Sequence, residues 1–382
     1  MSGAAGGFLH VSSLADDVWH GDGGPGAYEW WYFDAFSDDG RDALVVIFLA
    51  DFIFSPRFNR HAQRAAARRR AGDAPASDEE TRGLAAPLGG SHAARFPAVA
   101  VSFYRDGRPL WRAVNEYAAS EFDAGTRRPE CRIGRSGFRL EDGPRGKVFR
   151  ISLDETLRRG RRLHASLDWE LDAAEGSGAD GGAGGTSAAH EWNLVAPRCR
   201  VRGGLSVVGR GRPVGELDFE GTGYHDHNRD RRWLPATVAE WSWGRAHFDD
   251  STAVFYSYRE RHAREAVTRL FLARGGALSA HPARLTPQGS RRHVFGLRHP
   301  RALTVEAETT HATFRVSQSR VVDGSYFYLR FVGEATLDTG DGRPRAAPAL
   351  SELLAPRALN WRWLDWLTDM RIGRHGRAAF LK

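Results

Sequence analysis

The strongest constraint on the fold is a two-residue alternation of apolar and polar side chains over most of the chain. It is clear in 97–117, on both sides of Asp106-Gly107, and it recurs in 162–173. Alternation of this kind gives each face of a strand its own set of side chains, and Asp-Gly between two such runs is typical of a tight hairpin. Short runs follow one another at about ten-residue spacing. The pattern predicts an all-β protein of antiparallel barrels or sandwiches.

Two segments interrupt this pattern. Residues 59–94 are rich in Ala, Arg, Gly and Pro, and we expect them to form a disordered insert between two strands. Residues 174–189 have the Gly/Ala/Ser composition of a linker. We therefore expect two β domains, at 1–173 and 190–382, joined by this linker. A long loop inside one continuous domain is the alternative.

Helical periodicity is confined to 347–373, where it is interrupted at Pro356, and this segment predicts a short C-terminal helix. The longest apolar run, 43–54, is strand-like, contains Asp51 and is too short to cross a bilayer. The first residues lack the charged and apolar regions of a signal peptide. We expect a cytoplasmic protein, soluble or peripheral on the inner face of the cytoplasmic membrane.

The formal net charge of +7 does not indicate nucleic-acid binding, because much of the excess is local. Residues 59–72 carry a run of arginines and no acidic residue, whereas elsewhere basic and acidic residues alternate, as on solvated faces. Such a basic segment can contact anionic lipid headgroups. The two cysteines, Cys131 and Cys199, lack the spacing of a zinc site. We expect no nucleic-acid partner; the oligomeric state is not predicted.

The segment "GTGYHDHNRD" (221–230) is the most concentrated group of chemically active side chains. His225 and His227 would share one face of a strand, and His190 could be a third metal ligand. No further Cys, His or Glu stands at ligand spacing, so we expect no metal. A nucleophile elbow of the GxSxG type and a GxxxxGK phosphate loop are both missing from the sequence.

Proton transfer is the better chemical interpretation. Tyr224 and Asp226 are two residues apart, as are His190 and Trp192, so each pair would point to one side of a strand. A carboxyl among aromatic rings is desolvated, which raises its pKa toward a value useful for a general acid. The structural alternative stays open at this point: the aromatic residues would be core, and the histidines and aspartates would cap turns.

Five separated motifs resemble one known family. They are "GAYEWWYFDAF" (26–36), "FSPRFNRH" (54–61), "HEWNLVAPRCRV" (190–201), "GTGYHDHN" (221–228) and "EWSWGRAHF" (240–248), in this order. Together they resemble the carotenoid 1,2-hydratase family, also called hydroxyneurosporene synthase, over most of the chain. The resemblance implies tandem lipocalin-like β-barrels and cofactor-independent addition of water to the terminal C1=C2 double bond of an acyclic carotenoid. A cyclase or isomerase of a polyene or polyketide, and a non-catalytic carrier of a long apolar ligand, are the alternatives.

The resemblance also assigns roles to residues. Asp226 would be the general acid, Tyr224 and Trp192 would flank a tertiary carbocation, and His190 would orient water or Asp226. Asn228 is followed by Arg-Asp-Arg, where the family's pattern differs. The remaining expectations are a substrate-binding set of Trp30, Tyr32, Trp241 and Trp243, and a supporting set of Glu29, His225 and His227.

Overall fold

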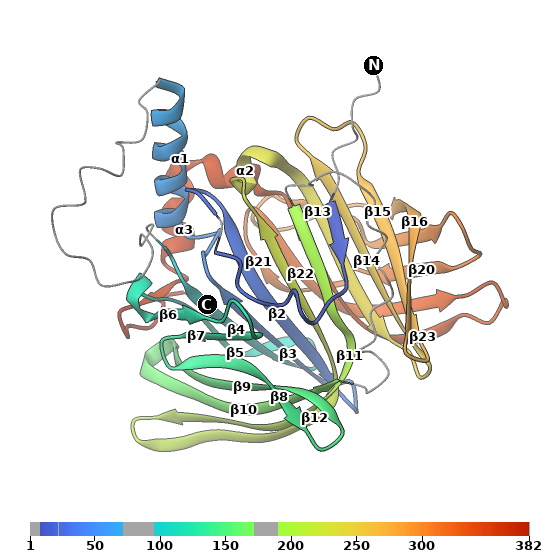
Figure 1. Ribbon diagram of the computed structural model, residues 1–382, viewed down its shortest axis with the longest axis horizontal. Coiled ribbons are helices and arrows are strands. Elements are labelled where there is room, and N and C mark those ends of the chain that lie inside the picture. The colour runs from blue at the N-terminus through green and yellow to red at the C-terminus, as the bar shows by residue number, and fades with distance from the viewer. Residues whose placement is uncertain (1–7, 22, 72–94, 172–189, 382) are drawn as a thin grey trace.

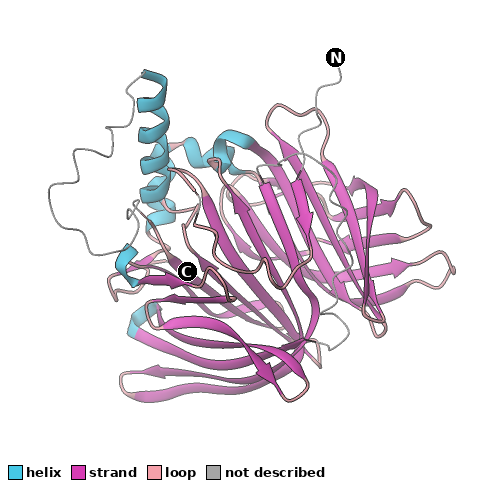
Figure 2. Cartoon of the chain, in the orientation of Figure 1, coloured by secondary structure: helices cyan, strands magenta, loops and turns pink. Residues whose placement is uncertain are grey.

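The computed structural model describes residues 8–21, 23–71, 95–171 and 190–381, and strands dominate these segments (Figure 2). They form two large curved antiparallel sheets that pack side by side (Figure 1). The predicted all-β fold is confirmed.

The first sheet has 13 strands and curls into a half-barrel, in the order β24-β5-β4-β3-β2-β12-β11-β10-β9-β8-β7-β6, with β1 beside β11. Its long central strands β11 and β12 carry both halves of the predicted site. Its strands are β1 (Phe8–Val11), β2 (Tyr28–Ser37), β3 (Asp42–Leu49), β4 (Ala98–Arg105), β5 (Arg108–Glu116), β6 (Phe122–Ala124), β7 (Glu130–Ile133), β8 (Ser136–Gly143), β9 (Gly146–Leu157), β10 (Arg161–Leu171), β11 (His190–Gly209), β12 (Arg212–Asp230) and β24 (Gly373–Arg374).

The second sheet has nine strands, and pairing of β20 with β22 closes eight of them into a barrel, with β21 outside the ring. A two-stranded ribbon, β17 (Arg291–Arg292) and β18 (Arg298–His299), lies apart from it. The strands of the second sheet are β13 (Val238–His247), β14 (Ser251–Glu260), β15 (Val267–Arg274), β16 (Ala277–Gln288), β19 (Ala302–Ala307), β20 (Thr313–Ser317), β21 (Arg320–Gly324), β22 (Tyr328–Asp338) and β23 (Arg345–Leu354).

The change from one sheet to the next does not fall where we expected a domain boundary. Strands β11 and β12, residues 190–230, pair with β10 and β2 of the first sheet, although we assigned them to the C-terminal domain. The chain passes from the first sheet to the second at 231–237. The short helix α2 (Leu234–Thr237) lies in this connection and is followed directly by β13. The Gly/Ala/Ser composition indicated a linker at residues 174–189, which lie outside the described residues. Strand pairing, which decides the boundary, leaves no compositional mark.

The predicted disordered insert at 59–94 is wrong over its first part. Residues 56–71 form the helix α1 (Pro56–Ala71), and 72–94 lie outside the described residues. Pro suits the first position of a helix, and Ala and Arg are strong helix formers. Phe58 and Ala62 are buried on one side of α1, which fixes the helix against the body of the protein. We had interpreted a basic amphipathic helix as an unpacked segment.

The predicted helix at 347–373 is also partly wrong. Its first residues belong to β23, because they pair with β13 on one side and β22 on the other. After Pro356 the chain forms single turns rather than one helix. Besides α2, the short helices of the described residues are α3 (Asp365–Asp369) and the 3₁₀ turns η1 (Ala119–Glu121), η2 (Arg158–Gly160), η3 (Pro356–Asn360) and η4 (Arg362–Leu364).

The apolar core has separate parts inside and between the sheets. One part fills the half-barrel, another fills the closed barrel, and a third lies where the two bodies meet. Alternate residues of β13 divide in this way, since Trp241 and Trp243 face the junction while Ala246 faces the barrel interior. Asp34 of β2 and Arg245 of β13, both fully buried, form an ion pair across the junction.

Candidate functional site

A large cavity lies at the junction of the two bodies. It has a volume of about 450 Å³ and is lined from both sheets and from the C-terminal segment, mainly by apolar and aromatic side chains. This size and lining are typical of sites for small apolar ligands. The residues that we expected to bind substrate, Trp30, Tyr32, Trp241 and Trp243, all line it. The rings of Trp30 and Trp241 stack across the junction, with centroids 5.6 Å apart and an angle of 5°.

Asp226 projects from β12 into the wall of this cavity. Its Oδ2 accepts hydrogen bonds from Trp192 Nε1 at 3.1 Å and from the Tyr224 hydroxyl at 2.7 Å. One member of each predicted strand-face pair, Tyr224 and Trp192, thus contacts Asp226, because β11 runs antiparallel to β12 with Trp192 opposite Asn228. Asp226 is buried, and its carboxyl is held in one orientation by neighbours on two strands.

The environment of Asp226 favours the protonated carboxyl. Burial raises its pKa to about 7, although the hydrogen bonds from Tyr224 and Trp192 favour the carboxylate and partly oppose this rise. At neutral pH the protonated and ionised forms are therefore both populated. A group with these properties can give a proton and take it back at one pH.

Asn228 is a part of the site that the sequence analysis did not assign. It lines the cavity, and its Nδ2 donates to Asp226 Oδ1 at 2.8 Å. Its own Oδ1 is buried and has no hydrogen-bond partner among the described residues. A rotated amide would present that oxygen to a proton on Asp226 Oδ1, since the two amide orientations are interchangeable in shape. The spacing from Asp226 was a usable signal, because residues two apart share a strand face.

His190 does not contact Asp226 in the way that we expected. Its Nε2 lies 2.6 Å from the Tyr256 hydroxyl, and its Nδ1 lies 3.4 Å from the Tyr28 hydroxyl. Burial, together with the nearby Arg232 charge, lowers the pKa of His190 to about 3, so the ring is neutral. It stacks on Tyr258 with ring centroids 4.7 Å apart.

Tyr256 connects His190 to the cavity. It lines the cavity and stacks on Trp192 with ring centroids 4.7 Å apart. It belongs to β14 of the second sheet, whereas His190 and Trp192 belong to β11 of the first. The sequence carried no signal for this contact, because Tyr256 stands in an ordinary alternating strand and meets the site through packing of the two sheets.

The supporting set, His225 and His227 of β12 with Glu29 of β2, lies on the opposite face of the first sheet from Asp226. His225 stacks on Phe33 with centroids 3.8 Å apart, and its Nε2 lies 3.0 Å from Asp17 Oδ2. His227 lies between Asp17 and Glu29. Strand alternation explains this separation. The two histidines therefore face the interior of the half-barrel, away from the cavity.

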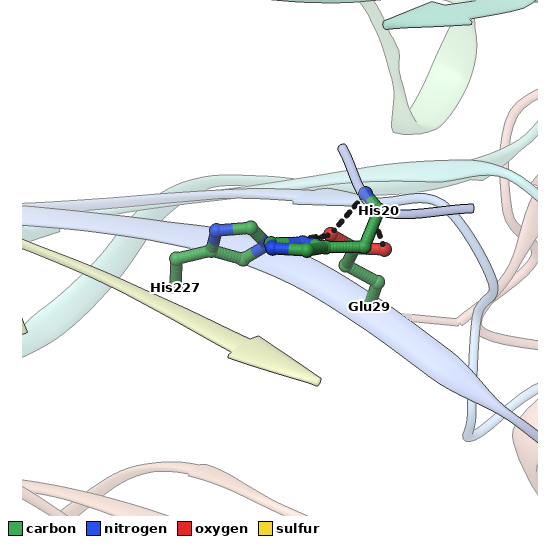
Figure 3. A group of neighbouring side chains, drawn as sticks. All are labelled: His20, Glu29 and His227. Atoms are coloured by element: carbon green, nitrogen blue, oxygen red, sulfur yellow. Dashed lines mark hydrogen bonds and ion pairs between the residues drawn. The ribbon is translucent and has the colours of Figure 1, made fainter. Parts of the chain in front are cut away.

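His20, Glu29 and His227 gather in one group (Figure 3). One ligand atom from each lies within 4.8 Å of the others, a spacing that could hold a metal ion. His227 has a carboxylate at both nitrogens, Asp17 at 3.3 Å and Glu29 at 3.0 Å. Burial opposes the charged ring, but these contacts outweigh it and raise the pKa of His227 to about 9.

The same contacts act on Glu29. Burial opposes its charge, and hydrogen bonds from His20 and His227 hold the pKa of Glu29 at about 2. The group is thus a charged network that joins β12 to the N-terminal segment. Glu29 thus pairs with two histidines, His20 and His227.

Other buried carboxyls also have a raised pKa. Burial raises the pKa of Asp51 and of Glu155 to about 7. Neither lines the cavity. Asp51 pairs with Arg95 at 2.8 Å, and Glu155 accepts hydrogen bonds from Ser136, Asn115 and Tyr117. A shifted pKa therefore does not by itself distinguish Asp226; its position on the cavity does.

An aromatic-lined cavity between a half-barrel and a closed barrel, with a buried carboxyl on its wall, defines a two-part lipocalin-like β protein with a site for an apolar ligand. The fold is similar to that of the AttH protein of Nitrosomonas europaea, with a TM-score of 0.57 and 16% identity over 93% of this chain and 98% of that one.

The chain belongs to the carotenoid hydratase CrtC family, whose model matches residues 183–380. It is 26% identical over 381 residues to a protein of Chlorobaculum tepidum named hydroxyneurosporene dehydrogenase, covering 95% of this chain and 91% of that relative. It is also 26% identical over 274 residues to the acyclic carotenoid 1,2-hydratase of Thiocapsa roseopersicina, covering 68% of this chain but 54% of that relative. This chain thus spans about half the length of that hydratase. The family and the tandem lipocalin-like fold predicted from the sequence are confirmed.

Proposed function

We propose that this chain adds water across the terminal C1=C2 double bond of an acyclic carotenoid, with Asp226 as the general acid. The observation that carries the proposal is a buried carboxyl with a pKa of about 7 on the wall of an aromatic-lined cavity. A carbon–carbon double bond is a weak base, so its protonation needs a neutral acid held close to it. Asp226 is the described carboxyl that combines these properties with access to an apolar ligand.

In the first step the C1=C2 π electrons take the proton from Asp226. The proton goes to C2, the less substituted carbon, and a tertiary cation forms at C1 while Asp226 becomes a carboxylate. The faces of Trp30, Trp241 and Trp243 line the space around it and attract a cation through their ring quadrupoles. The carboxylate charge adds a further attraction, because Asp226 is buried and water screens its charge only weakly.

In the second step a water oxygen bonds to C1 and loses a proton. The Asp226 carboxylate, with a pKa of about 7, is a stronger base than His190, whose pKa is about 3, so the proton returns to Asp226. The role of His190 is then to position water. If Tyr28 donates to Nδ1, the Nε2–H donates to Tyr256, whose own hydrogen can then bond a water that enters the cavity. The product is a tertiary alcohol, and the acid is regenerated.

This cycle needs no added redox or metal group, because the protons balance within Asp226, water and substrate. We therefore propose that the reaction is cofactor-independent. The His20–Glu29–His227 network offers the direct check. Dialysis of the protein against EDTA should leave the hydration rate and Tm unchanged, whereas a loss restored by added Zn²⁺ would assign an ion to that group.

The test is incubation with lycopene or neurosporene followed by mass analysis of the product. Hydration adds the mass of one water, whereas the dehydrogenation named for the Chlorobaculum tepidum relative removes two hydrogens. Asp226→Asn should lower turnover by at least about a hundredfold, the contribution typical of general acid catalysis. Glu155→Gln is the matched control. Burial raises the pKa of Glu155 to about 7, as it does for Asp226, but Glu155 does not line the cavity.

Other outcomes distinguish the alternatives. Bound substrate with no change in mass would indicate a carrier or an isomerase. A product formed at the same rate by Asp226→Asn would show that another group supplies the proton.

A further inference from the structure

Three tryptophans near the C-terminus are exposed. Trp361, Trp363 and Trp366 are 47%, 71% and 55% exposed, whereas the tryptophans of the sheets, such as Trp31 and Trp192, are buried. The rings of Trp361 and Trp363 stack with centroids 6.4 Å apart. We call these three residues the tryptophan patch. Exposed aromatic groups of this kind mark surfaces that contact another apolar phase or a partner.

A row of arginines lies beside the tryptophan patch. Arg60, Arg64 and Arg68 are four residues apart on α1 and so share one face of that helix. Arg60 donates to Asp365 at 2.8 Å, next in sequence to Trp366. Figure 1 shows α1 alongside α3, and the two helices are in contact. The arginine row thus begins at the tryptophan patch.

The acidic groups around the patch are paired. Asp365 accepts from Arg60, and Asp369 accepts from Arg374, each at 2.8 Å. The helix α1 has no acidic residue, and Arg64 and Arg68 are exposed. The surface therefore combines exposed indole rings with positive charge. Among the described residues, no helix is both long and apolar enough to cross a bilayer.

The same segment that exposes the tryptophans lines the cavity on its inner side. Leu367, Thr368 and Ile372 are cavity residues, directly after Trp366 in sequence. The C-terminal segment thus separates the cavity from the tryptophan patch by the thickness of one short helix.

We propose that the tryptophan patch and the arginine row dock the protein on a bilayer with anionic headgroups, and that the apolar ligand enters the cavity beside α3. Indole rings are favoured at the level of the lipid headgroups, because the ring can contact the acyl chains while its N–H group contacts water. Arginines near such a surface are attracted by about 1 kcal/mol each. The proposed membrane docking does not depend on which reaction takes place in the cavity. The proposed entry of the substrate beside α3 rests on the proposed function.

The first experiment measures flotation with vesicles of phosphatidylcholine alone and of phosphatidylcholine with phosphatidylglycerol. The full chain should bind the anionic vesicles more tightly, and added salt should weaken this binding. Arg64→Glu/Arg68→Glu should reduce the affinity roughly tenfold or more, and Trp363→Ser/Trp366→Ser should do so on both vesicles. The control is Arg284→Glu/Arg315→Glu, which makes the same charge change at exposed positions of β16 and β20, on the other side of the molecule (Figure 1).

The result that would overturn the proposal is equal binding by the patch variants and the control. Such a result would mean that another partner, such as a protein, covers this surface. Vesicles with brominated acyl chains give a second readout, because they should quench the fluorescence of the full chain more than that of Trp363→Ser/Trp366→Ser. Equal quenching would also contradict the proposal.

The second experiment separates docking from chemistry. The patch residues do not line the cavity, so their variants should hydrate a detergent-dispersed carotenoid at the rate of the full chain. With carotenoid embedded in anionic vesicles, the same variants should be roughly tenfold slower. Loss of rate on both substrates would refute entry at this surface. Absence of hydration by the unmodified chain would refute the proposed function and leave the docking result standing.

Discussion

At the scale of single residues, the alternation of β12 decides which side chains can act on a ligand. Tyr224, Asp226 and Asn228 share the cavity face, while His225 and His227 face the half-barrel. The two histidines are the most conspicuous residues of the segment, yet they contact the buried carboxylates of Asp17 and Glu29 and do not face the cavity. The carboxyl between them has the exposure to the cavity that chemistry requires.

The pH dependence of the rate follows from Asp226. The reacting form is the protonated one, so kcat/KM should fall tenfold per pH unit above about pH 7. The Tyr224 hydroxyl bonds the ionised form and thereby lowers the pKa of Asp226. Tyr224→Phe should therefore move this alkaline limb to higher pH, by about one unit for a lost bond to a charged group. The measurement is kcat/KM against pH.

Tyr32→Phe provides the control for that profile. Tyr32 lines the same cavity, and its hydroxyl has no hydrogen-bond partner among the described residues. Its removal should leave the limb in place. A limb that does not move in Tyr224→Phe, or that moves to lower pH, would mean that a different group sets the profile.

At the scale of elements, the Asp34–Arg245 pair joins β2 of the first sheet to β13 of the second. Both residues are fully buried, and burial lowers the pKa of Arg245 to about 9. Asp34 Oδ2 and Arg245 Nη1 have no hydrogen-bond partner among the described residues. The desolvation of both charges is thus only partly offset by their contact.

Arg245→Met should destabilise the protein by about 3–5 kcal/mol, because it leaves a buried carboxylate without its partner. The double variant Asp34→Leu/Arg245→Met should recover most of this loss, since it removes both charges. The free energy of unfolding in urea measures both effects. A double variant as unstable as the single one would show that the pair itself holds the sheets together.

The strands and helices also show how much of the fold could be predicted from the sequence. Two-residue alternation predicted most of the strands, although not β23, because it reports directly which face is buried. It could not predict that 190–230 complete the first sheet, because pairing partners leave no trace in a single strand. The segment 56–71 was misjudged because composition alone does not reveal that Phe58 and Ala62 bury one side of a basic helix.

At the scale of the whole molecule, the cavity exists because two sheets bring their outer faces together. The four aromatic residues named from the motifs line it, and Trp192 bonds Asp226, so spacing within strands was enough to find them. Tyr256 could not be found in this way. It reaches His190 from the other sheet, and that contact depends on how the two bodies pack.

The central claim is that the protein delivers a proton to C2 of the substrate and that Asp226 is its source. The most direct measurement is hydration in D₂O, with the position of deuterium in the product determined by NMR and mass analysis. We expect one non-exchangeable deuterium, at C2, in a product that has gained one water, and loss of this product in Asp226→Asn. A product without carbon-bound deuterium, or undiminished deuteration by Asp226→Asn, would contradict it.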